Sequence, residues 1–146
     1  MLIKSIMTRR VKCVKPVDTA RRASLMMVRN NIGSVLVREK SKAVGIITEH
    51  DIMKRVVASG KDPDRMQCRK IMSAPLRTID AHDTIDAAVE IMAKKRLKRL
   101  VVTRDGDLVG IVTATDILKS GEKIEMAALR QLAEFFPVYL PTDQAG

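Results

Sequence analysis

The chain is poor in several residue types, and each shortage excludes a class of protein. Aromatic residues make up only 2% of the sequence, and none precedes Phe135. Aliphatic residues and methionine must therefore fill the core, and a surface that stacks nucleic-acid bases on aromatic rings is disfavoured. No apolar run approaches the ~18 residues of a membrane span. The N-terminus also lacks the apolar core of a signal peptide, so we expect a cytoplasmic protein without a membrane partner.

Residues that commonly carry catalysis or bind metals are also scarce. The two cysteines, Cys13 and Cys68, have no metal-ligand spacing, which favours inert thiols in a reducing compartment. The glycines are isolated, so there is no phosphate-binding Walker loop. Neither His50 nor His82 has the nearby cysteine, serine or carboxylate of a catalytic triad. We therefore expect no enzyme, no metal site and no required cofactor.

Positive charge, in contrast, is abundant. The formal net charge of +10 favours anionic partners such as nucleotides, nucleic acid or an acidic protein, although solvated charge on exposed helices is an alternative. The densest cluster is Lys94-Lys95-Arg96, followed by Lys98-Arg99. It suits the exposed end of a helix. Because no helix-turn-helix, zinc or RNA-binding signature accompanies it, nucleic acid is a partner that we do not favour.

The most informative feature is an internal repeat. The segment GIITEHDI at 45–52 recurs as GIVTATDI at 110–117, and the same offset of 65 residues relates Ile6-Met7-Thr8 to Ile71-Met72-Ser73 without a gap. Such a repeat indicates two copies of one supersecondary unit. Each copy is too small to bury a good core alone. We therefore expect the copies to pack closely about a pseudo-twofold axis, with a site at their junction that occurs twice.

Both copies have the pattern strand, helix, strand, strand, helix. In the second copy we predict strands over 76–79, 99–103 and 108–112, a helix capped by Asp83, and a last helix from Thr115-Asp116. In the first copy we predict strands over 11–14, 34–38 and 43–47, a helix from Asp18, and another from about Asp51 to Gly60. Gly110, in mid-strand, indicates a close approach of backbone or ligand. The predicted fold class is α/β (α+β).

These elements predict three parts of the chain. The first copy occupies residues 1–62 and the second copy residues 63–120, whereas residues 121–146 form a C-terminal helix and tail. Glu122 to Phe136 has the apolar stripe of an amphipathic helix, which Pro137 ends. A stripe of this kind needs a surface to cover, on this chain or on a second one.

The repeated Gly-apolar-apolar-Thr-x-x-Asp-Ile pattern contains the candidate binding residues. Thr48 and Asp51, and likewise Thr113 and Asp116, fall where a strand passes into a helix. An aspartate there can accept hydrogen bonds from a ribose diol, and the threonine hydroxyl and free helical N–H groups suit phosphate. The same spacing is a helix capping box, which is a purely structural alternative. Two occurrences at a fixed offset favour a ligand site.

The doubled pattern, the Ile-Met-Thr and Ile-Met-Ser openings and the strand order resemble a pair of CBS motifs, a tandem also called a Bateman module. The resemblance covers roughly residues 1–120. It implies a non-catalytic regulatory module that binds AMP, ADP, ATP or S-adenosylmethionine in one of two clefts between the copies. In this reading Asp51 and Asp116 match the ribose-binding aspartate, and Thr48 and Thr113 match the hydroxyl that contacts phosphate or ribose.

Other positions match the CBS pattern unevenly. Thr115 fits the small polar residue before the aspartate, whereas His50 departs from it and either reaches a phosphate or is exposed. Lys98-Arg99 matches the basic pair before the middle strand in the second copy, but Gly33-Ser34 stands there in the first. A proline frequent in that strand is replaced by Leu36 and Val101. The resemblance implies a crossed arrangement, in which Asp51 shares its cleft with Lys98-Arg99.

We therefore expect a stand-alone CBS pair that senses an adenine nucleotide and acts through an unidentified effector protein. The resemblance also implies a homodimer. Two alternatives are a basic scaffold or nucleic-acid-binding protein with vestigial nucleotide clefts, and a sensor of S-adenosylmethionine.

Overall fold

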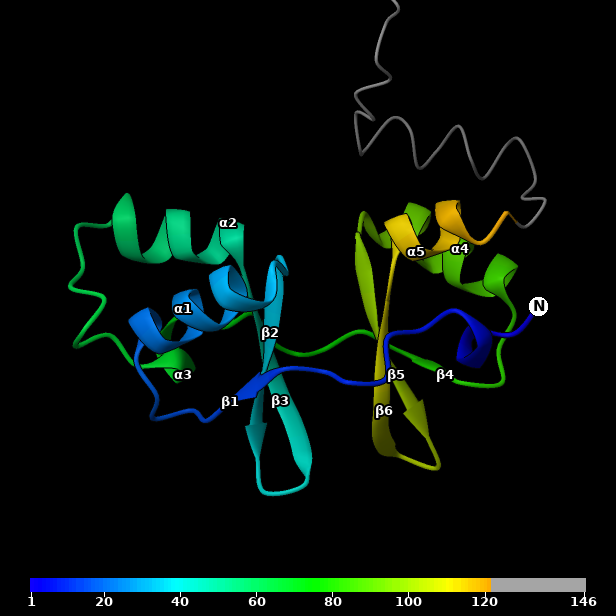
Figure 1. The fold of residues 1–146 in the computed structure, drawn as a ribbon, viewed down its shortest axis with the longest axis horizontal. Helices are drawn as coiled ribbons and strands as arrows, with labels where there is room; N and C mark the ends of the chain where they lie inside the picture. Colours follow the sequence, from blue (N-terminus) through cyan, green and yellow to red (C-terminus); the bar gives the residue numbers. More distant parts are fainter. Residues whose placement is uncertain (122–146) are drawn as a thin grey trace, which may run out of the picture.

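The computed structural model describes residues 1–121, which form two similar halves with one three-stranded sheet each. In each sheet the first strand is parallel to the second, and the second is antiparallel to the third. Figure 1 shows the sheets side by side, with α1, α2 and α3 to one side of the first. This α+β arrangement of two repeats confirms the predicted fold class. The strands are β1 (Cys13–Val14), β2 (Ser34–Glu39), β3 (Lys42–Thr48), β4 (Thr78–Asp80), β5 (Arg99–Arg104) and β6 (Asp107–Thr113).

The longest described helices are α1 (Ala20–Asn30) and α4 (Ile85–Lys95), and they begin later than predicted. Their N-caps are Thr19 and Thr84, whose hydroxyls accept hydrogen bonds from backbone N–H groups in the first turn. The neighbouring Asp18 and Asp83 were expected to start these helices, but their carboxylates accept from Lys15 N and Asp80 N in the preceding turns. When Asp and Thr are adjacent, both can cap, and here the threonine does so in both copies.

The third strand of each half leads directly into a helix. α2 (Glu49–Ile52) continues as the π-helix η2 (Met53–Val57), and α5 (Ala114–Lys119) is its counterpart. Both begin earlier than predicted, because Thr48 and Thr113 are the N-caps and each aspartate is the third helical residue of a complete capping box. The helix predicted from Glu122 to Phe136 lies outside the described residues.

Two short helices were not predicted, and each packs on the opposite half of the molecule. The 3₁₀-helix η1 (Ile3–Ser5) bonds to the second half, where Ile3 N donates to Asp83 O, and Thr8 then pairs with Ile111 of β6. The later helix α3 (Cys68–Ile71) leads to Ser73, which pairs with Ile46 of β3. We call residues 1–8 and 66–73 the lead-in segments. Each lead-in segment belongs in sequence to one copy and in space to the other.

The lead-in segments also complete the two hydrophobic cores. Ile3 is fully buried among second-half residues such as Leu100 and Val102, whereas Cys68 and Ile71 are buried in the first half. Burial raises the pKa of the Cys68 thiol to about 11, with a contribution from Asp18, so this thiol is protonated at neutral pH. Neither core can close without a segment from the other copy.

A glycine lies under each lead-in segment. A Cβ atom on Gly110 would lie 2.7 Å from Thr8 O, and one on Gly45 would lie 2.4 Å from Met72 Sδ. The close approach predicted at Gly110 is therefore confirmed, and its partner is backbone. Within residues 1–121, no helix is both long and apolar enough to cross a membrane.

Candidate functional site

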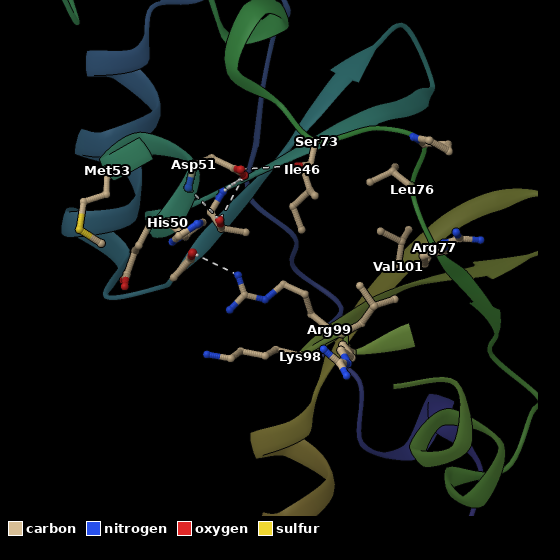
Figure 2. Close-up of a pocket in the computed structure, with 16 residues that line it drawn as sticks. Ile46, His50, Asp51, Met53, Ser73, Leu76, Arg77, Lys98, Arg99 and Val101 are labelled. Carbon is tan, nitrogen blue, oxygen red and sulfur yellow. Dashed lines mark hydrogen bonds between the residues drawn. The ribbon is translucent and has the colours of Figure 1, made fainter. Parts of the chain in front are cut away.

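A cavity of about 640 Å³ lies between the two halves. Thr48, His50 and Asp51 line it from the first half, and Lys98 and Arg99 line it from the second. Figure 2 shows the Lys98 and Arg99 side chains extending toward the start of α2. The structure thus brings together the residues that the crossed arrangement assigned to one cleft.

Asp51 is the buried acidic group of this cavity, with an exposed fraction of only 5%. Its Oδ2 accepts hydrogen bonds from Thr48 N at 2.9 Å and Thr48 Oγ1 at 3.1 Å. Its Oδ1 accepts from Ser73 Oγ at 3.1 Å and lies 3.8 Å from Arg55 Nη1. Two hydrogen bonds thus reach Oδ2 and one reaches Oδ1, so a carboxylate with about four lone-pair sites keeps acceptor capacity at Oδ1.

Arg99 connects the two halves at the cavity. Its Nη1 donates to the carbonyl oxygen of Gly33 at 3.2 Å, and its buried Nε has no hydrogen-bond partner. Burial lowers the pKa of the Arg99 guanidinium, while the carboxylates of Glu49 and Asp51 act in the opposite direction. Because arginine remains charged even so, the cavity holds a partly desolvated cation that a phosphate could contact.

Several lining residues were not identified from the sequence. The apolar part of the wall includes Leu76, Leu97 and Val101, and the further charged residues are Glu49 and Arg77. Arg96, of the basic cluster noted in the sequence, also lines the cavity. The only sequence signal for Leu76 and Arg77 is that they follow the repeated Ile-Met-Ser segment, whose pairing with β3 directs the chain past the cavity. Two of the charged side chains are not repeated, since Glu49 corresponds to Ala114 and Arg96 to Asn31, whereas Arg77 corresponds to Lys12.

The second predicted set of residues lies apart from this cavity, at the start of α5. Thr113 and Asp116 form the second capping box, in which Asp116 Oδ2 accepts from Thr113 N at 2.9 Å. Thr115 is exposed, and Asp116 is only half-buried. The two aspartates therefore share a local motif but differ in their surroundings.

The arrangement at Asp51 has three features that suit the binding of a small molecule. It offers a carboxylate that can accept from hydroxyls, an apolar wall for a flat ring, and basic side chains for an anion. In the described part of the chain, no group of three histidine, cysteine or acidic side chains could hold a metal ion. The cavity volume falls within the usual range of small-molecule sites, roughly 300–1,000 Å³.

Comparison with known families identifies the fold. The CBS domain family matches the chain twice, over residues 3–58 and 68–123. The chain belongs to the CBS domain family. It is a tandem CBS pair, as the repeated motifs indicated, and tandem CBS domains are commonly regulatory modules.

Individual relatives agree with this assignment. An uncharacterized protein of Methanopyrus kandleri is 42% identical over 106 residues, which cover 71% of this chain and 54% of that protein. The CBS pair thus spans about half the length of that relative. A CBS domain-containing protein of Bacillus subtilis, YhcV, is 30% identical over 79% of this chain and 81% of its own length.

A solved structure confirms the fold. The crystal structure of a conserved CBS domain protein of unknown function from Thermoplasma acidophilum superimposes with a TM-score of 0.82. The sequences are 26% identical, and the match covers 94% of this chain and 77% of that one. The two CBS repeats and their relative arrangement are therefore shared with a known structure.

Proposed function

We propose that this CBS pair is a non-catalytic sensor that binds an adenine nucleotide (AMP, ADP or ATP) in the cavity between its repeats. Thr48 and Asp51 bind the ribose side of the ligand, and Lys98 and Arg99, with His50 at the rim, bind its phosphate. Leu76, Leu97 and Val101 supply apolar surface for the base. Binding then changes how the pair contacts an effector protein.

The observation that carries this proposal is the convergence of Asp51 with Lys98 and Arg99 across the repeat boundary. A ribose acceptor and phosphate-binding cations come from different copies, yet they line one cavity of nucleotide size. A purely structural role for the two capping boxes does not account for a partly buried arginine that reaches from one repeat to the Gly33 carbonyl of the other.

Calorimetric titration with AMP, ADP, ATP and S-adenosylmethionine tests the proposal directly. We expect saturable binding of at least one phosphorylated nucleotide. Absence of binding by all four ligands at millimolar concentration would contradict it. Tight binding of S-adenosylmethionine alone would instead identify the alternative sensor, whose ligand carries a sulfonium in place of phosphate.

The formal net charge of +10 supports a second candidate, a basic scaffold that binds nucleic acid. The two candidates differ in their salt dependence. Phosphate-backbone binding weakens steeply with salt because counterions are released, whereas binding inside a cavity weakens less. Retention on immobilised AMP in moderate salt, without competition by RNA or heparin, favours the sensor.

A further inference from the structure

The carboxylate expected to hold the ribose already has an internal partner. Ser73 Oγ donates to Asp51 Oδ1 at 3.1 Å, and both residues line the cavity. Figure 2 shows this hydrogen bond between Asp51 and Ser73 as a dashed line. A ribose diol would present two hydroxyl donors to the same carboxylate.

Ser73 is not needed to orient Asp51. Thr48 already fixes the carboxylate through its backbone N–H at 2.9 Å and its hydroxyl at 3.1 Å. Both of these contacts are made to Oδ2, so the Ser73 hydroxyl takes up Oδ1, the other oxygen of the carboxylate. The orientation of the carboxylate therefore does not depend on Ser73 alone.

The lead-in segment holds Ser73 in this position. Ser73 N donates to Ile46 O at 2.8 Å, and Ser73 O accepts from Ile46 N at 3.1 Å. Arg55 Nη1 donates to both Ile71 O and Met72 O at 2.8 Å. Arg55 thus holds Ile71 and Met72, the two residues before Ser73, and its guanidinium also lies beside Asp51.

Within the described residues, the capping box of Thr113 and Asp116 has no hydrogen bond equivalent to the one that Ser73 donates to Asp51. Thr8 stands at the position equivalent to Ser73, and Ser120 stands at that of Arg55. Ser120 Oγ donates to Ile117 O within its own helix. Among residues 1–121, the hydrogen bonds to the Asp116 carboxylate come from Thr113 alone. The repeat therefore provides a matched internal comparison.

We propose that Ser73, positioned by Arg55, is an internal occupant of the ribose subsite at Asp51, and that it weakens the binding of ribose-containing ligands in this cleft. Thr48 keeps its two contacts with Oδ2, so a ribose hydroxyl binds at Oδ1, where the Ser73 hydroxyl competes with it. Removing the Ser73 hydroxyl therefore strengthens the binding of a ligand that has a ribose diol and leaves a ligand without one unchanged. This inference rests on the proposed function.

The test compares Ser73→Ala with the matched control Thr8→Ala by calorimetric titration with AMP and with 2′,3′-dideoxy-AMP. Removing the internal competitor should strengthen AMP binding about twofold to tenfold, the equivalent of one ordinary hydrogen bond. Dideoxy-AMP has no diol, so its affinity should stay unchanged in Ser73→Ala. Thr8→Ala should bind both ligands like the unaltered chain.

Two further variants separate competition from a general structural effect. Ser73→Thr keeps the hydroxyl and should retain the original affinity for AMP. Arg55→Lys keeps a positive charge near Asp51, but its shorter side chain lacks the planar guanidinium and should hold the Ile71 and Met72 carbonyls less firmly, so AMP binding should strengthen in the same direction by a smaller factor. Ser73→Gly, which also lacks the hydroxyl, replaces Ser73→Ala if the latter does not fold.

Each outcome is decisive. Unchanged or weaker AMP binding in Ser73→Ala, or an equal gain for AMP and dideoxy-AMP, overturns the inference while the nucleotide site stands. Absence of AMP binding in the unaltered chain and in every variant overturns the proposed function, and the inference with it.

Discussion

Asp51 and Asp116 occupy identical places in two copies of one motif, yet their side chains are in different environments. Asp51 is buried beside Ser73 and Arg55 and shares a cavity with Arg99. Asp116 is half-buried and follows the exposed Thr115. At the residue scale, the local motif therefore determines the helix cap, and the residues packed around it determine whether the aspartate lies in a cleft.

The first prediction concerns this difference. Asp51→Ala and Arg99→Ala should each abolish the tight step of nucleotide binding, while Asp116→Ala leaves it in place. Loss of one charge-assisted hydrogen bond costs about 1.5–3 kcal/mol, or roughly ten- to a hundredfold in affinity. Calorimetry on the three variants measures it. Loss of the tight step in Asp116→Ala but not in Asp51→Ala would invert the assignment of the clefts.

The second prediction uses the glycines under the lead-in segments. Gly110→Ala should destabilise the fold by about 1–3 kcal/mol, because the new methyl group meets a backbone carbonyl that is hydrogen-bonded in place. Gly45→Ala should cost less, since the atoms it meets belong to the flexible Met72 side chain. Urea denaturation of both variants gives the comparison. An equal loss in both would show that the Thr8 backbone shifts as readily as a side chain.

The repeat made part of this site predictable from sequence. Thr48, Asp51, Lys98 and Arg99 each stand in a motif, and the resemblance of these motifs to CBS pairs implies their pairing across the copies. In the sequence, Ser73 stands out only as the last residue of the repeated Ile-Met-Ser opening. Its hydrogen bond to Asp51 depends on where the lead-in segment crosses β3. The spacing of residues along the sequence does not show where that segment pairs with β3.

At the scale of elements, the order of strands and long helices followed from hydrophobic periodicity and turn residues. The starts of α1 and α4 differ from the prediction because adjacent Asp and Thr can both cap, whereas α2 and α5 begin earlier because the threonine three residues before the aspartate is the N-cap. The lead-in helices were not found, since η1 and α3 have only 3 and 4 residues and too few turns to show a period.

The third prediction tests whether each lead-in segment stabilises the half of the molecule on which it packs. Ile3→Ala should reduce the free energy of unfolding by about 2–5 kcal/mol, because it removes a fully buried side chain from the core of the second half. Hydrogen exchange should accelerate more in α4 and β6 than in α1 and β3. Val17→Ala, at a largely exposed position, is the control and should change stability by less than about 0.5 kcal/mol. Faster hydrogen exchange confined to the first half would contradict the packing of residues 1–8 against the second half.

At the scale of the whole molecule, a ligand between the repeats binds only the folded chain. The fourth prediction is that AMP or ATP raises the melting temperature, with about 2.7 kcal/mol of added stability at a ligand concentration near 100 times the dissociation constant. Inorganic phosphate at equal ionic strength should leave the melting temperature unchanged. Equal shifts with nucleotide and phosphate would indicate generic anion binding.

The fifth prediction is that the chain forms a homodimer. Several large apolar side chains are exposed on the helices of the described residues, including Val28, Met53 and Val57. Pairing with a second copy would remove them from water. Light scattering at tens of micromolar should give twice the mass of one chain, with or without nucleotide. A single-chain mass under both conditions would refute the prediction.

The exchanged lead-in segments also bear on how the molecule responds to proteolysis. Lys61 is exposed in the stretch that joins the two halves, so trypsin can cut the chain there. The resulting fragments would each retain a segment embedded in the other, with Ile3 in one direction and Cys68 and Ile71 in the other. We therefore expect a nicked chain to stay together, because separating its fragments would expose buried side chains of both cores.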